Sequence, residues 1–95
     1  MEIQASSNNI TVQGNIKTVS DFQQIKELLD GIVSKHQAIV LHIIDSLSMT
    51  SSVIGYLNKL VLKDNISIQM RVGNEQLLEL LNDLNLTTTF NAKKA

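Results

Sequence analysis

The stretch AIVLHIIDSLSMTSSVIGYLNKLV, residues 38–61, decides the fold class because one polar loop joins an apolar run to a helical pattern. Residues 38–44 are β-branched and apolar at both alternating positions. Such a run is typical of a central strand that is covered on both faces, as in parallel sheets. Apolar residues then recur at helical spacing from Val53 onward, which predicts a helix. The connecting loop is therefore Asp45 to Thr50.

The residues before this stretch predict a β-hairpin followed by an amphipathic helix. Apolar and polar residues alternate on both sides of the polar turn at residues 6–9, which is typical of two paired strands. Ser20 and Gln23 resemble a capping box at the start of the helix. One face of that helix collects the apolar residues Val19, Phe22, Ile25, Leu28, Leu29, Ile32 and Val33.

The residues after the stretch predict a strand and a final helix. Residues 66–72 alternate between apolar and polar, so one face of this strand should lie in the core. Asn74 is expected to cap the last helix, whose apolar side is formed by Leu77, Leu78, Leu80, Leu81 and Leu84. Residues 86–90 form an optional last strand. Residues 91–95 have nothing to bury, which is typical of a flexible tail.

The order of elements predicts an α/β fold. Right-handed crossovers between alternating strands and helices should give a mixed, mostly parallel sheet of four to five strands, with an N-terminal β-hairpin and three main helices. The chain has 95 residues, of which 43% are hydrophobic, and this suits a single domain over residues 1–95.

Composition argues against several classes of partner. The formal net charge of −1 gives no broad reason to bind nucleic acid. The longest apolar run is far short of the ~20 residues that cross a bilayer, so no membrane insertion is expected. No signal-peptide pattern opens the chain, and a cytoplasmic protein is the default expectation. There is no cysteine for a disulfide or a thiolate metal site.

The start of the central helix is where the serines matter. Ser51 or Ser52 falls at this helix start, at the carboxyl end of a central strand, where open α/β sheets tend to place ligand sites. The unpaired amides and positive dipole end of a helix favour a phosphate group. The alternative is that Thr50 or Ser51 simply caps the helix, and local chemistry by itself favours this interpretation.

No set of residues indicates an enzyme. His36 follows a helix and His42 lies within the central strand, so neither has an evident route to Ser52 as a catalytic base. For His42 we expect a hydrogen-bonded core residue. There is no Gly-rich phosphate loop and no metal-ligand spacing, and no cofactor is expected.

Along about nine-tenths of its length the chain resembles a STAS domain, the family of sulfate-transporter domains and anti-sigma-factor antagonists. Residues 50–55, Thr-Ser-Ser-Val-Ile-Gly, match the antagonists' Asp-Ser-Ser-Gly-Leu-Gly, and Gly14 matches the glycine after the family's second strand. The resemblance implies phosphorylation of Ser52, with Ser51 the weaker candidate. It also implies a partner-binding surface made of Thr50, Ser51, Val53 and Ile54.

The implied partner is an anti-sigma-factor-type serine kinase or a related signalling protein, with a PP2C-like phosphatase as a further partner. ATP and magnesium would belong to the kinase.

Three positions depart from the family pattern, since Thr50 replaces aspartate while Val53 and Asn85 replace glycines. These departures leave open a constitutive adaptor subunit, as in STAS domains of transporter complexes, and a small ligand such as a nucleotide.

Overall fold

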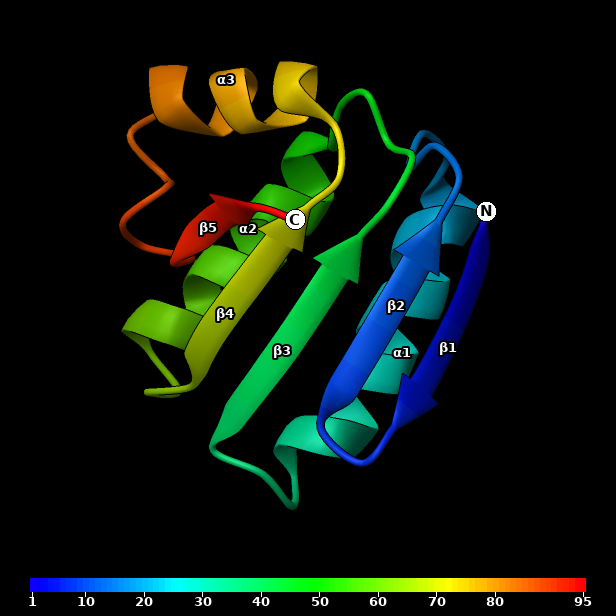
Figure 1. Ribbon diagram of the computed structural model, residues 1–95. Helices are drawn as coiled ribbons and strands as arrows, with labels where there is room; N and C mark the ends of the chain where they lie inside the picture. The colour runs from blue at the N-terminus through cyan, green and yellow to red at the C-terminus, as the bar shows by residue number, and fades with distance from the viewer.

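The computed structural model describes residues 1–95 and confirms the α/β fold (Figure 1). A five-stranded sheet has the strand order β1-β2-β3-β4-β5, in which β1 is antiparallel to β2 and all other neighbours are parallel. The elements are β1 (Glu2–Ser6), β2 (Asn9–Gln13), α1 (Val19–Val33), β3 (Ala38–Ile43), α2 (Ser51–Leu62), β4 (Ser67–Val72), α3 (Glu75–Asp83) and β5 (Ala92–Lys94).

Only one face of the sheet is covered by helices. Figure 1 shows α1 and α2 behind the sheet and α3 near the ends of β4 and β5, while no helix crosses the front. Parallel strands that follow one another in sequence order, joined by right-handed crossovers, must place every crossover on the same side. The expectation that residues 38–44 are covered on both faces is therefore wrong. Ile39, Leu41 and Ile43 are buried, but Ala38 is exposed and Val40 is half-buried.

The core lies between the covered face and the helices. It is almost wholly aliphatic, and Phe90 and Tyr56 are its aromatic members. Its fully buried side chains from the strands include Ile10, Val12, Leu41, Ile68, Met70 and Val72. Ile25, Leu29, Leu57, Leu60, Leu77 and Leu81 contribute from the helices.

The last strand is displaced from its predicted position. Residues 87–91 form turns, and the strand is Ala92–Lys94, so the expectations of a strand at 86–90 and a flexible tail at 91–95 are wrong. Phe90 is fully buried and holds the turn against the core. Asn91 then takes a left-handed conformation, with φ of 47°, which redirects the chain alongside β4.

The helix ends differ from the sequence expectation at two places. Thr18, not Ser20, caps α1, and its capping-box partner is Asp21 instead of Gln23. Val19 follows the cap and points outward with 74% of its surface exposed, so it does not belong to the apolar face. At the end of α3, Leu84 is 48% exposed and Asn85 is left-handed, with φ of 59°. Asparagine adopts this left-handed conformation more readily than most residues do.

Candidate functional site at the start of helix α2

Two loops that lead into α1 and α2 are tied together by side-chain hydrogen bonds. The Ser46 hydroxyl accepts a bond of 3.1 Å from the Ile16 amide and donates one of 2.6 Å to the Ser48 carbonyl. In return, the Asn15 side-chain oxygen accepts a bond of 3.0 Å from the Leu47 amide. Ser46 is fully buried, so this serine has a structural task that sequence analysis missed. No residue pattern in the sequence distinguishes it from Ser48, the exposed serine of the same loop.

The start of α2 agrees with the sequence expectation. Thr50 is the N-cap in an extended conformation, and its hydroxyl accepts a bond of 3.3 Å from the Val53 amide. Ser51 and Ser52 form the beginning of the first turn, and both are exposed. Their amides donate to no backbone oxygen, as is usual at a helix start, and the first turn contains no acidic residue. The Ser52 hydroxyl therefore lies beside free donors at the positive end of the helix.

Ser52 also borders a hollow between the starts of α1 and α2. The hollow has a volume of about 290 Å³. It is lined by Lys17, Thr18, Val19, Phe22, Gln23, Thr50 and Ser52. The Lys17 side chain forms none of the ion pairs of the protein, and Asp21 accepts from the backbone amides of Lys17 and Thr18. These amide bonds, with that to Lys17 foremost, lower the pKa of Asp21.

Two residues that the resemblance assigns to partner binding have limited access to a partner. Val53 is only 1% exposed and packs in the core, so the expectation that its side chain forms part of a docking surface is wrong. The Val53 side chain fills space between α2 and the sheet. It could reach the surface only if α2 moved. Ile54 is half-buried and leaves part of its side chain accessible.

The outer surface of α2 continues away from Ser52. Gly55 and Lys59 are exposed along it, and Leu62 has 68% of its surface exposed. A shallow hollow of about 270 Å³ is lined by Gly55, Asn58, Lys59, Leu62 and Lys63. We call the exposed residues Ser51, Ser52, Gly55, Lys59 and Leu62 the outer face of α2.

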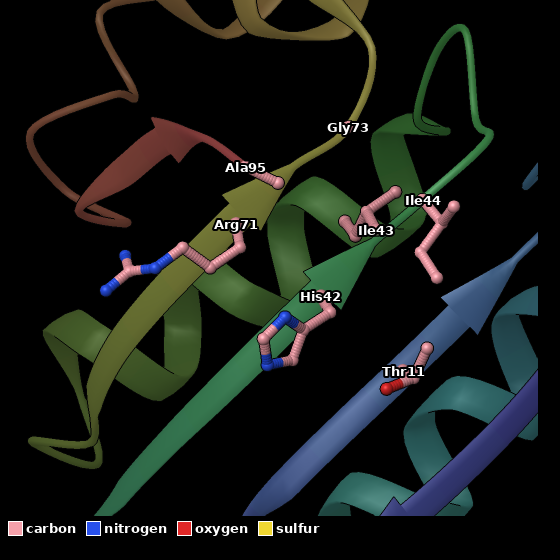
Figure 2. A pocket seen from close by; sticks show the side chains of 7 residues that line it. All are labelled: Thr11, His42, Ile43, Ile44, Arg71, Gly73 and Ala95. Atoms are coloured by element: carbon pink, nitrogen blue, oxygen red, sulfur yellow. The ribbon is translucent and has the colours of Figure 1, made fainter.

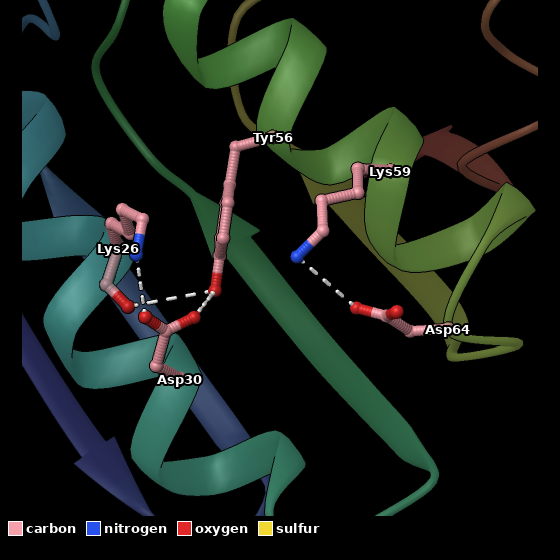
Figure 3. Close-up of polar contacts among 5 residues, drawn as sticks. All are labelled: Lys26, Asp30, Tyr56, Lys59 and Asp64. Atoms are coloured by element: carbon pink, nitrogen blue, oxygen red, sulfur yellow. Dashed lines mark hydrogen bonds and ion pairs between the residues drawn. The ribbon is translucent and has the colours of Figure 1, made fainter.

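One turn beyond Ser52, Tyr56 joins α2 to α1 (Figure 3). Its hydroxyl donates to the Asp30 carboxylate, which also accepts a bond of 2.7 Å from Lys26. The Tyr56 ring meets the edge of Phe22, with the ring centroids 6.3 Å apart. Burial, followed by the bond to Asp30, raises the pKa of Tyr56. The bonds from Lys26 and Tyr56 lower the pKa of Asp30. This contact fixes the spacing of the two helices whose starts border Ser52.

The histidines lie apart from this site. His42 is half-buried on the uncovered face of the sheet and its ring makes no hydrogen bond to the protein, so the expectation of a hydrogen-bonded core histidine is wrong. No three His, Asp or Glu side chains are grouped so that they could hold a metal ion. No helix has both the length and the apolar character that a membrane span requires.

Comparison of the chain with protein-family models, curated proteins and solved structures gave no match.

Proposed function

We infer that this protein is a phosphorylation-switched binding module, similar in its working to an anti-sigma-factor antagonist. The observation that carries the proposal is the position of Ser52, whose exposed hydroxyl lies in the first turn of α2 beside unpaired amides. The same position borders the hollow between α1 and α2, so a partner that docks there would cover the hydroxyl.

In the unmodified state, Ser52 and its accessible neighbours Thr50, Ser51 and Ile54 form part of the docking surface for an anti-sigma-factor-type serine kinase or a related signalling protein. The kinase supplies ATP and magnesium. The Ser52 oxygen attacks the γ-phosphorus, a new O–P bond forms, the bond to ADP breaks, and the serine proton passes to a base of the kinase. No base for this step is required from the present chain.

Phosphorylation would then change the charge of the surface without unfolding it. A phosphoserine brings ≈ −1.5 to −2 charges at neutral pH. The free amides at the start of α2 and the unpaired Lys17 favour that charge within the free protein. A partner surface that had matched a neutral hydroxyl must now desolvate the phosphate and is released. A PP2C-like phosphatase would restore the neutral state by hydrolysing the ester.

Mass spectrometry after incubation with the cognate kinase and ATP tests the proposal. We expect one phosphate on Ser52, no phosphorylation of a Ser52→Ala variant, and normal phosphorylation of Ser51→Ala. Phosphate on another residue, or on none, would contradict the switch.

A constitutive adaptor subunit is the second candidate function. It is favoured by Thr50, which caps the helix through its hydroxyl and puts no carboxylate beside Ser52. Affinity capture with wild-type and Ser52→Asp baits separates the two functions, with Ser6→Asp on the exposed edge strand β1 as a charge-matched control. The switch predicts a partner that binds wild type and Ser6→Asp and is lost with Ser52→Asp, and it predicts phosphate on Ser52 of protein from native cells. A partner held equally by all three baits would favour the adaptor.

A further inference from the structure

The uncovered face of the sheet carries a row of three basic residues that the proposed switch does not use. The strand register places His42 beside Arg71 and Arg71 beside Lys93, on three neighbouring strands. Neighbouring strands are about 4.8 Å apart, so the row is about 10 Å long. Among the strand residues that point to this face, Glu2 is the one acid, and it lies on β1 at the other side of the sheet.

Arg71 and Lys93 form a like-charge pair that no protein carboxylate compensates. The three ion pairs of the protein involve Lys26, Lys59 and Lys94, and neither member of this pair takes part in one. Like charges directly opposite each other on adjacent strands are destabilising. This repulsion should mainly destabilise β5, which has only three residues and is held through its pairing with β4. An anion bound between the two side chains would remove this repulsion.

The side chains around this pair border an open polar hollow. It has a volume of about 220 Å³ and is lined by Gln69, Arg71, Asn91 and Lys93, with no hydrophobic residue. Arg71 donates a bond of 3.3 Å to the side-chain oxygen of Gln69, which leaves the Gln69 amino group free to donate elsewhere. Asn91 donates a bond of 3.1 Å to the Ile68 carbonyl and so fixes the turn that forms one wall. We call the space between these four residues the polar hollow.

A second hollow adjoins the first at Arg71. It has a volume of about 340 Å³ and is lined in part by Thr11, His42 and Ile44 (Figure 2). Figure 2 shows Thr11 and His42 side by side, while the Arg71 guanidinium points across β4, away from His42. Arg71 therefore presents its charge to the polar hollow, and its stem borders a larger space with a hydroxyl, an imidazole and aliphatic carbon.

We propose that the polar hollow binds the phosphate group of a small phosphorylated molecule, whose organic part lies in the adjoining hollow beside Thr11 and His42. A phosphate fits these donors better than a carboxylate does. It carries a larger charge and three terminal oxygens, so it can bind the guanidinium, the ammonium and an amide at once. The site lies on the opposite side of the sheet from α2, and the inference does not depend on a switch at Ser52.

An NMR titration of the full chain with inorganic phosphate at constant ionic strength tests the site. We expect saturating shift changes at the amides of residues 69–71 and 91–93. Lys93→Gln and Arg71→Gln should each weaken binding by about tenfold, because each removes one charge-assisted contact. Lys35→Gln, which removes an exposed cation just after α1, should leave the affinity unchanged. Glycerol 3-phosphate should bind more tightly than phosphate and add shift changes at Thr11 and His42.

The stability of the free variants provides a second readout. If Lys93 is placed for an anion, Lys93→Gln should raise the melting temperature of the ligand-free protein slightly while it weakens phosphate binding. Loss of affinity with Lys35→Gln equal to that with Lys93→Gln would overturn the proposal, as would shift changes that do not saturate. Saturable changes confined to the starts of α1 and α2, or acetate binding as strong as phosphate binding, would also overturn it.

Discussion

Ser46 and Ile16, thirty residues apart in sequence, are joined by a buried hydrogen bond of 3.1 Å from the Ile16 amide to the Ser46 hydroxyl. Both residues are buried, Ser46 at 0% and Ile16 at 1% exposed. The bond holds the loop before α1 against the loop before α2. Since the hollow beside Ser52 is lined by the starts of both helices, this bond helps to set the shape of the candidate docking surface.

Replacing Ser46 by alanine should lower the stability by about 1–3 kcal/mol, because the buried Ile16 amide loses its acceptor. For a domain of this size the melting temperature should fall by roughly 4–8 °C for each kcal/mol. Ser48→Ala is the matched control, since Ser48 is exposed and contributes only its backbone carbonyl to the network. Equal stability of the two variants in thermal unfolding would show that water reaches the Ile16 amide.

Thr50 should contribute about 1 kcal/mol as the N-cap of α2, so Thr50→Ala should destabilise the protein by this amount. Thr50→Asp should keep the cap and add a favourable charge at the helix start. Urea unfolding of both variants measures these changes in stability. If Thr50→Asp also speeds phosphorylation of Ser52 by the proposed kinase, a carboxylate at position 50 acts in the switch; unchanged phosphorylation would limit its effect to the helix.

The Tyr56–Asp30 bond should make stability depend on pH at the alkaline end. The pKa of Tyr56 is raised in the folded state, so its contribution is complete below the unfolded pKa of about 10 and is lost as the pH rises further. The free energy of unfolding of the wild type should exceed that of Tyr56→Phe by about 1 kcal/mol near pH 7, and this difference should shrink above about pH 10. Denaturant unfolding of both proteins from pH 7 to 11 measures this. A constant difference would contradict the assignment.

The same contact should respond to acid through Asp30. Because the folded-state pKa of Asp30 is lowered, chiefly by the bond from Lys26, its contribution is present above the unfolded value of about 4 and is lost as the pH falls through the lower folded value. Asp30→Asn should therefore be less stable than wild type at neutral pH and approach it below about pH 4. Asp83→Asn, an exposed carboxylate without an ion pair, serves as the control.

The fold requires glycine at position 73, whereas Gly31 and Gly55 leave room for a side chain. A side chain at Gly73 would place its Cβ 2.5 Å from the Ile44 carbonyl oxygen, so Gly73→Ala should cost about 1–3 kcal/mol. Gly31 and Gly55 have nothing within 4 Å, and alanine at either helical position should stabilise the fold by roughly 0.5–1 kcal/mol. If the outer face of α2 is a docking surface, Gly55→Ala alone should also weaken partner capture. Equal capture by both alanine variants would place the partner elsewhere.

The alternation of apolar and polar residues and the helical spacing determined the identity of every major element. Burial of one stripe or one face follows directly from these periods, so β2, β3, β4 and all three helices were predictable from local pattern. The start of α2 was predictable for the same reason, because Val53, Leu57 and Leu60 must share the buried face. The short β5 was not predictable, since its place depends on burial of Phe90, just before the strand, in a core built from distant segments.

Tertiary structure alone decided that β3 is covered on one face only and which loop residues meet. A strand that is apolar at both parities predicts two covered faces, yet the strand order β1-β2-β3-β4-β5 puts every crossover on one side and leaves Val40 and His42 on the other. Strand order results from pairing between distant segments, which leaves no periodic trace in the sequence. The buried position of Ser46 and the row of His42, Arg71 and Lys93 arise in the same way, because their neighbours come from other parts of the chain.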